Sequence, residues 1–340
     1  MDKRDIKPHM IDELWFHKGC PDGLGSLFCF YVWNRWNVSD NIVLNCKGLV
    51  HGEPPPDGKC KNVAIFDFCF GMEEMKKLFD ECNALVVFDH HQSQEKVMKS
   101  FKNCMYDNEH SGAHLAFRFF FPEMVDVPRF IAHIEDRDLW KWKVEGSKEY
   151  SAYVYYSLKN QMEDWYNLFV DHDKRVFRDW NDPIYTEIIE TGKKYLICQE
   201  ELVRNMAKNV STCMSCGIKC MVSNSSILKS ELGGQMLSSY TDCKAAIIWD
   251  YDGKKHEYNF SIRTRTNETN AFVFAKKYGG GGHATASGFK IKRMKRNTKV
   301  DVVDILSFFD DIANEMEEPK LIITNGSYKS ICHMKRDDLI

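Results

Sequence analysis

The sequence lacks the features that mark several classes of protein. Of its 340 residues, only 20 are glycine and 9 are proline, which excludes a collagen-like or a low-complexity disordered chain. No apolar run approaches the 18 or so residues that a membrane-spanning helix requires. Neither sign of charge dominates, since 46 Lys and Arg face 49 Asp and Glu. A protein that coats nucleic acid with a basic surface is therefore excluded, and any anion site must come from a local group of cations.

Cysteine, in contrast, is abundant, with 13 residues in the chain. The number is odd and the residues are scattered, so we expect no regular disulfide framework. The chain opens with Asp2, Lys3, Arg4 and Asp5, unlike the basic and then apolar start of a signal peptide. We therefore expect free thiols, a reducing compartment and a cytoplasmic location, with no membrane as partner.

The first half of the chain alternates between short apolar runs and segments with helical periodicity. Strands are predicted at Leu14–His17, Val63–Phe66 and Leu85–Phe88, with helices at Ser26–Trp36 and Met72–Cys82. This alternation indicates an α/β fold in which a parallel sheet carries helices on both faces. Ligands of such sheets bind at the carboxyl ends of the strands.

The chain is long enough for about two domains. We predict a larger α/β domain over residues 1–182, followed by a helical linker over 183–209. A smaller α/β domain is predicted over 210–295, because short apolar strands and turns follow Val210. Residues 296–340 are predicted to form a helical extension, since apolar residues recur there at helical spacing.

Polar residues follow the predicted strands, where a parallel sheet would bring them to one edge. They are His17, Asp22, Asp67, Asp89, His90 and His91, with Asp136 and Asp138 further along the chain. Carboxylates crowded at one edge repel one another unless a cation lies between them. Two divalent ions bridged by one carboxylate would satisfy this group, and imidazole with carboxylate suits Mn²⁺. The alternative is that these side chains only satisfy buried backbone groups.

A second pattern is the glycine run Gly279–Gly282, which His283 follows. Consecutive glycines allow several backbone N–H groups to approach one anion, which favours a phosphate cradle over a plain flexible loop. Arg263 and Arg265 end a predicted strand shortly before the run. Arginine binds phosphate through two parallel hydrogen bonds, so this segment is predicted to bind substrate.

Taken in order, these motifs resemble the DHH phosphoesterase superfamily. The resemblance covers roughly residues 14 to 290 and rests on His17…Asp22-Gly23, Asp67, Asp89-His90-His91, Asp136 and the Gly-Gly-Gly-Gly-His segment. The last segment resembles the DHH-associated C-terminal domain. Superfamily members include RecJ-type nucleases, nanoRNases and cyclic-dinucleotide phosphodiesterases. Manganese pyrophosphatases also belong to it, but they carry a different second domain.

The resemblance also implies a role for each matching residue. The metal ligands would be His17, Cys20, Asp22, Asp67, His90 and Asp136, with Asp67 bridging two ions. The residues that bind or act on substrate would be His91, Arg263, Gly280, Gly281, Gly282 and His283, with Asp22 and Asp67 sharing the catalytic role. Cys20 departs from the superfamily pattern, which commonly has Asp there. Mn²⁺ is the expected ion, and Mg²⁺, Co²⁺ or Zn²⁺ are alternatives because a thiolate favours softer ions.

The function predicted on this basis is metal-dependent hydrolysis of phosphodiester bonds in short oligonucleotides or small nucleotides. One alternative is a cyclic-dinucleotide phosphodiesterase. Another is a nucleotide-binding protein that lost catalysis through Cys20. The substrate is the one partner that the resemblance implies, and a homodimer stays an open alternative. Trp140 and Trp142, close to Asp138, could stack on a base, but packing behind the metal site is the favoured interpretation.

Overall fold

The computed structural model describes residues 6–38, 45–158, 161–215, 218–265 and 269–292. The chain forms two compact units, residues 1–199 and 200–340. Each unit combines helices with a sheet of its own, which confirms the predicted α/β class. The predicted C-terminal helical extension over 296–340 lies outside the described residues.

A five-stranded parallel sheet forms the centre of the first unit, in the order β2-β1-β3-β4-β5. Its strands are β1 (Glu13–His17), β2 (Cys46–Leu49), β3 (Asn62–Phe66), β4 (Ala84–Asp89) and β5 (Cys104–Tyr106). The three inner strands are the three predicted ones. The edge strands β2 and β5 were not predicted, because β2 reads Cys-Lys-Gly-Leu and has no apolar run, and β5 is only the three residues Cys-Met-Tyr.

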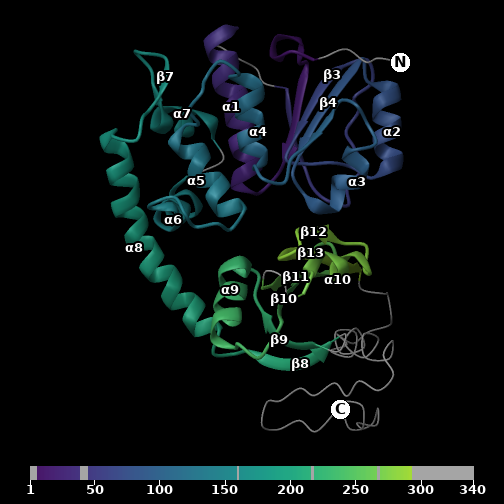
Figure 1. The fold of residues 1–340 in the computed structure, drawn as a ribbon, viewed down its shortest axis with the longest axis vertical. Coiled ribbons are helices and arrows are strands. Elements are labelled where there is room, and N and C mark those ends of the chain that lie inside the picture. The colour runs from purple at the N-terminus through teal and green to yellow at the C-terminus, as the bar shows by residue number, and fades with distance from the viewer. Residues whose placement is uncertain (1–5, 39–44, 159–160, 216–217, 266–268, 293–340) are drawn as a thin grey trace. The chain divides into compact units, whose positions relative to one another are not determined.

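Helices cover both faces of this sheet, as predicted (Figure 1). The helices of the first unit are α1 (Pro21–Asn37), α2 (Met72–Glu81), α3 (Glu95–Met98), α4 (Gly112–Phe120), α5 (Arg129–Asp138), α6 (Ser147–Ser157) and α7 (Met162–Phe169). α1 and α4 lie together on one face, and α2 and α3 lie on the other. A short hairpin, β6 (Val170–Asp171) and β7 (Val176–Phe177), follows α7.

Alternate residues of the strands enter two apolar cores. Phe16, Phe66 and Phe88 face the larger core with residues of α1, α4 and α5. Trp15 and Ile65 face the smaller core, which contains residues of α2 and α3. Every residue of β4 is buried, as expected for an inner strand of a sheet covered on both faces.

The long helix α8 (Pro183–Met206) lies in the segment predicted as a helical linker over 183–209, and the boundary between the units falls within it. The second unit contains a six-stranded mixed sheet in the order β12-β13-β11-β10-β9-β8. Its elements are β8 (Ser211–Ser215), β9 (Ile218–Asn224), α9 (Lys229–Ser239), β10 (Ala245–Asp252), β11 (Glu257–Thr264), α10 (Ala271–Lys276), β12 (Gly281–Gly282) and β13 (Ala286–Lys292). α9 and α10 contribute to separate apolar cores of this unit.

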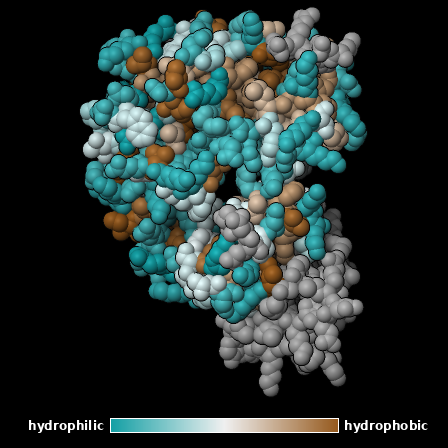
Figure 2. Space-filling view, viewed as in Figure 1, coloured by the Kyte–Doolittle hydropathy of each residue, from teal (hydrophilic) through white to brown (hydrophobic). Residues whose placement is uncertain are grey.

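Hydrophilic residues cover most of the face shown in Figure 2, and hydrophobic residues reach it in separate patches. Within the described ranges, no helix has both the length and the apolar character that crossing a membrane requires.

A buried carboxylate anchors the start of β1. Glu13 is only 6% exposed, and its oxygens accept hydrogen bonds from Trp15 Nε1 at 2.8 Å and from Lys61 Nζ at 2.6 Å. Lys47 Nζ, on the neighbouring strand β2, lies 2.8 Å from the same carboxylate. Burial alone would raise the pKa of Glu13, but contacts with Lys47, Lys61 and Trp15 lower it to about 2.

We therefore expect Glu13→Gln to destabilise the protein by about 1.5–3 kcal/mol at pH 7, the scale of hydrogen bonds to a charged group. Because the pKa of Glu13 is lowered in the folded state, its contribution is present above about pH 4.5 and is lost as the pH falls towards 2. Urea unfolding of the metal-free protein at several pH values measures this difference. The exposed Glu123→Gln serves as control. A gap between wild type and Glu13→Gln that does not shrink below pH 4.5 would contradict the assignment.

Candidate metal centre

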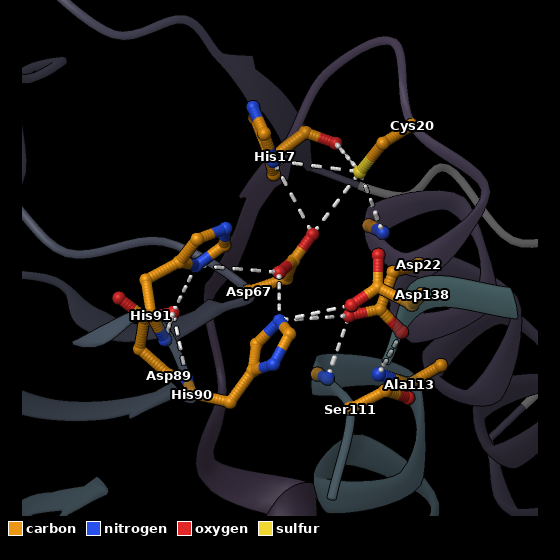
Figure 3. Close-up of polar contacts among 12 residues, drawn as sticks. His17, Cys20, Asp22, Asp67, Asp89, His90, His91, Ser111, Ala113 and Asp138 are labelled. Carbon is orange, nitrogen blue, oxygen red and sulfur yellow. Dashed lines mark hydrogen bonds and ion pairs between the residues drawn. The ribbon is translucent and has the colours of Figure 1, made fainter. Parts of the chain in front are cut away.

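The carboxyl ends of three adjacent strands bring the predicted ligands together (Figure 3). His17 is the last residue of β1, Asp67 follows β3, and His90 and His91 follow β4. These strands are neighbours in the order β1-β3-β4, so their ends meet at one edge of the sheet. The predicted convergence of these polar residues is therefore what the structure shows.

Asp67 lies at the centre of this group. Its Oδ2 is 3.1 Å from Cys20 Sγ and 3.4 Å from His17 Nδ1. Its Oδ1 is 3.1 Å from His90 Nε2 and 3.8 Å from His91 Nδ1. The two oxygens of one carboxylate thus face two different sets of donors, which is the arrangement that a bridging ligand needs. The backbone of Asp67 has a φ of 57°, which is uncommon for a residue other than glycine and is found at functional sites.

The first donor set consists of His17, Cys20 and Asp67. Cys20 is also the N-cap of α1, because its Sγ accepts a hydrogen bond from Gly23 N at 3.2 Å. Gly23 is required here, since a Cβ at this position would lie 2.0 Å from the carbonyl oxygen of His17. Burial, and then the charges of the neighbouring carboxylates, raise the pKa of the Cys20 thiol. Without a cation this thiol stays protonated, and its S–H donates a hydrogen bond to Asp67 Oδ2.

The second donor set surrounds a single nitrogen. His90 Nε2 lies 3.1 Å from Asp67 Oδ1, 3.4 Å from Asp138 Oδ2 and 3.5 Å from Asp22 Oδ2. One N–H can donate to one carboxylate at full strength, so three carboxylates compete for it. His90, Asp22 and Asp67 are each at most 1% exposed.

The titration behaviour of these carboxylates reflects their crowding. Burial, followed by the charges of Asp67 and Asp138, raises the pKa of Asp22 well above its usual value. Burial also raises the pKa of Asp138. Burial would raise that of Asp67 too, but hydrogen bonds with His17 and His90 hold it well below its usual value. A divalent cation in each set would neutralise this excess of negative charge, so the residues present fit a two-metal centre.

Asp22 is held in place by the start of α4. Its Oδ2 accepts from Gly112 N at 2.6 Å and its Oδ1 from Ala113 N at 2.9 Å. A helix N-terminus stabilises a carboxylate in this position. A Cβ on Gly112 would lie 2.4 Å from the Cβ of Asp67 and 2.9 Å from Asp22 Oδ2. Glycine at this position therefore allows α4 to approach both carboxylates.

The structure does not bring Asp136, a predicted metal ligand, to this group. Its carboxylate accepts hydrogen bonds from Lys143 N at 2.8 Å and Val144 N at 3.1 Å. Asp138, two residues later, lies beside His90 instead. On a helix, positions two apart point in different directions, so only one carboxylate of the Asp-Arg-Asp motif can face the centre. The sequence offered both, and the rotation of α5 decided between them.

Asp89 contacts His91 and the backbone of His90, and it belongs to neither of the two donor sets described above. Asp89 Oδ1 accepts from His91 Nδ1 at 2.7 Å and from His90 N at 2.8 Å. Burial alone would lower the pKa of His91, but the charge and hydrogen bond of Asp89 raise it. Asp89 therefore orients His91 and favours its charged form. The first residue of the Asp-His-His motif acts here as a support.

Sequence reasoning missed His51, which comes from the loop after β2. Its ring stacks on that of Phe68 with centroids 4.5 Å apart, and its centroid lies 5.1 Å from that of His17. No strand was predicted before it, so nothing in the sequence placed it at this edge of the sheet.

In the second unit, the glycine run forms part of a hairpin. β12 pairs with β13 in antiparallel register, and a Cβ on Gly280 would lie 2.1 Å from Gly288 O. Gly280 N donates to Ala275 O, and His283 N donates to Ala286 O. Two amides of the predicted phosphate cradle are thus engaged within the unit. Close packing of the hairpin is a reason for glycine at 280 that needs no ligand.

Arg263 lies at the same end of this sheet, because it pairs with Ala286 across β11 and β13. Its guanidinium donates to Ser230 Oγ at 2.8 Å and to Ile262 O at 2.9 Å.

Comparisons with known proteins agree with this architecture. No family model matches the chain. An uncharacterized protein of Acanthamoeba polyphaga mimivirus is 29% identical over 313 residues, covering 86% of this chain and 70% of that protein. Among solved structures, the DHH domain of a member of the S1p family of ribosomal proteins matches with a TM-score of 0.53 and 14% identity, over 89% of this chain and 87% of that one. The chain has the DHH-domain fold.

Two other solved structures are similar to this chain with lower TM-scores. A pGpG-specific phosphodiesterase from Vibrio cholerae matches at 0.42, with 15% identity over 89% of this chain and 99% of that one. The exonuclease RecJ bound to manganese matches at 0.44, with 11% identity over 89% of each chain. The DHH-domain fold predicted from the motifs is confirmed by the match at a TM-score of 0.53.

The different surroundings of Asp136 and Asp138 predict different effects on metal binding. Asp138→Asn should weaken binding of Mn²⁺ by about 10-fold or more, at least the loss seen when a supporting partner of a metal ligand is removed. Asp136→Asn, the matched control, should leave Mn²⁺ affinity unchanged, because its carboxylate contacts backbone amides. Titration calorimetry with Mn²⁺ on both variants measures this. Equal losses, or a loss only in Asp136→Asn, would reverse the assignment.

Proposed function

We propose that this DHH-fold chain is a metal-dependent phosphoesterase that hydrolyses phosphodiester bonds of short oligonucleotides or small nucleotides. The observation that carries this proposal is Asp67, whose two oxygens face two separate donor sets in a buried, carboxylate-rich group. Two divalent ions a few ångströms apart are a recurring device for phosphoryl transfer. Mn²⁺ is the proposed ion, since the donors are mostly carboxylate and imidazole.

His17, Cys20 and Asp67 would hold one ion, and Asp22, Asp67, His90 and Asp138 the other. Bound there, the ions would activate water and stabilise negative charge on the phosphoryl group. Asp67 would keep the two ions in register, and the amides of Gly112 and Ala113 would fix Asp22. His91, kept charged by Asp89, would donate a hydrogen bond to the phosphate.

We propose that the second unit carries a substrate-binding surface of its own. Arg263, Gly280, Gly281, Gly282 and His283 would carry this role, as the superfamily resemblance implies. The pairing of β11 with β13 places Arg263 and the glycine hairpin at one end of the same sheet. This supports a common binding surface within the unit.

The bridging role of Asp67 gives the sharpest test of this function. Asp67→Ala should abolish turnover and lower metal content, because it removes a charge from both donor sets. The exposed Asp80→Ala is the control and should behave as wild type. Purified protein is assayed with Mn²⁺, Mg²⁺, Co²⁺ and Zn²⁺ against a dinucleotide, a short oligonucleotide and a cyclic dinucleotide. Activity in Asp67→Ala would exclude the two-metal assignment. No turnover of any substrate by wild type with any ion would leave a nucleotide-binding protein.

The sulfur of Cys20 is expected to influence which divalent ion supports activity. Cys20→Asp replaces a sulfur by a harder oxygen and should shift activity towards Mn²⁺ and Mg²⁺ relative to Zn²⁺. Cys198→Asp on α8 is the control, since this thiol is exposed and belongs to neither donor set. The measured quantity is the ratio of kcat/KM with Mn²⁺ to that with Zn²⁺. An unchanged ratio would mean that Cys20 serves only as the cap of α1.

A further inference from the structure

Two tryptophans follow α5 directly after the metal centre. Trp140 is 41% exposed, and Trp142 is partly buried. Their rings meet edge to face, with centroids 4.9 Å apart. The favoured sequence-based interpretation, packing behind the metal site, does not describe Trp140, because a large part of its indole reaches the surface.

The backbone of this segment is strained in a specific way. Trp140 and Trp142 have φ values of 55° and 52°, in the left-handed region that residues with a side chain rarely adopt. Bulky residues hold this conformation only where the surroundings enforce it, and such positions gather at binding and catalytic sites. Strain of this kind is typical of a segment that binds a ligand.

Asp136 holds the backbone of this segment in place through hydrogen bonds. Its backbone oxygen accepts from Lys141 N at 2.8 Å and Trp142 N at 3.4 Å. Its carboxylate accepts from Lys143 N and Val144 N. One residue thus fixes four successive amides and closes the segment into a rigid turn. The motif carboxylate that does not reach the metal centre is the one that shapes the tryptophan turn.

The chemistry around the two rings is basic as well as aromatic. Lys141 and Lys143 flank Trp142 in sequence and are exposed, and Lys148 Nζ lies 5.9 Å from the centre of the Trp142 ring. An open cavity of about 240 Å³ adjoins this ring, and its lining includes Lys143 and Lys148 as well as Glu145 and Glu149. Aromatic rings interleaved with cations are typical of surfaces that bind single-stranded nucleic acid.

We propose that Trp140 and Trp142 form a nucleobase-binding site, on which a base of the substrate stacks while its phosphate lies at the metal centre. Trp140 is two residues from Asp138, so their Cα atoms are at most about 7 Å apart. That span is within the reach of one nucleotide between its base and its phosphate. This inference rests on the proposed function, to which it adds the residues that would bind the base of the substrate.

Matched substrates test the site. For a dinucleotide, Trp140→Ala should raise KM by about 10-fold, within the range for loss of one stacked base, with kcat changing less. For the same dinucleotide lacking one base, the same variant should show the KM of wild type. Trp140→Phe should retain most of the affinity, because a smaller ring still stacks. Tyr155→Ala, which removes another exposed ring, is the control and should match wild type on both substrates.

A binding measurement separates this site from the proposed activity. Titration calorimetry of the Mn²⁺-loaded protein with adenosine monophosphate and with inorganic phosphate should show a loss of about 10-fold for the nucleotide alone in Trp140→Ala. Equal losses for both ligands would assign Trp140 a structural role and overturn the proposal, as would no loss for either. If wild type hydrolyses nothing but the nucleotide-specific loss is present, the proposed function fails and the base site stands.

Discussion

Three carboxylates converge on one imidazole nitrogen, and the first unit holds them there: Asp22 and Asp67 are buried, and Asp138 is half-buried. Asp22, Asp67 and Asp138 lie within 3.5 Å of His90 Nε2. Like charges in a buried place repel strongly unless opposite charge and hydrogen bonds compensate them. Burial and this repulsion raise the pKa of Asp22 and of Asp138. A pair of divalent cations would neutralise this charge, so the geometry favours a metal centre over a set of structural hydrogen bonds.

Several features of the backbone around the metal centre hold these carboxylates close together. Cys20 caps α1 while its sulfur stays beside Asp67. Gly23 and Gly112 permit contacts that any side chain would block. The first amides of α4 bind the carboxylate of Asp22. Each of these features costs conformational freedom or helix propensity, and together they place charged groups that would otherwise avoid one another.

The segment from Asp136 to Trp142 shows how one short motif serves two purposes. Asp138 faces the centre, and Asp136 faces the opposite way and ties down the turn that follows. The proposed metal ligand and the residue that holds the tryptophan turn are thus two positions apart at the same helix end.

The sequence by itself determined the fold class, the inner strands and most of the centre. Apolar runs that end in polar residues identify parallel strands, and the carboxyl ends of neighbouring strands must meet. His17, Asp67 and His90 could be placed for that reason. Only the tertiary structure decided between Asp136 and Asp138, because the choice depends on the rotation of α5 about its axis. It also added His51, which comes from a loop after an edge strand with no apolar run. Only the tertiary structure showed that Trp140 is exposed and strained. Hydrogen bonds across a turn set its conformation, and sequence periodicity does not reveal them.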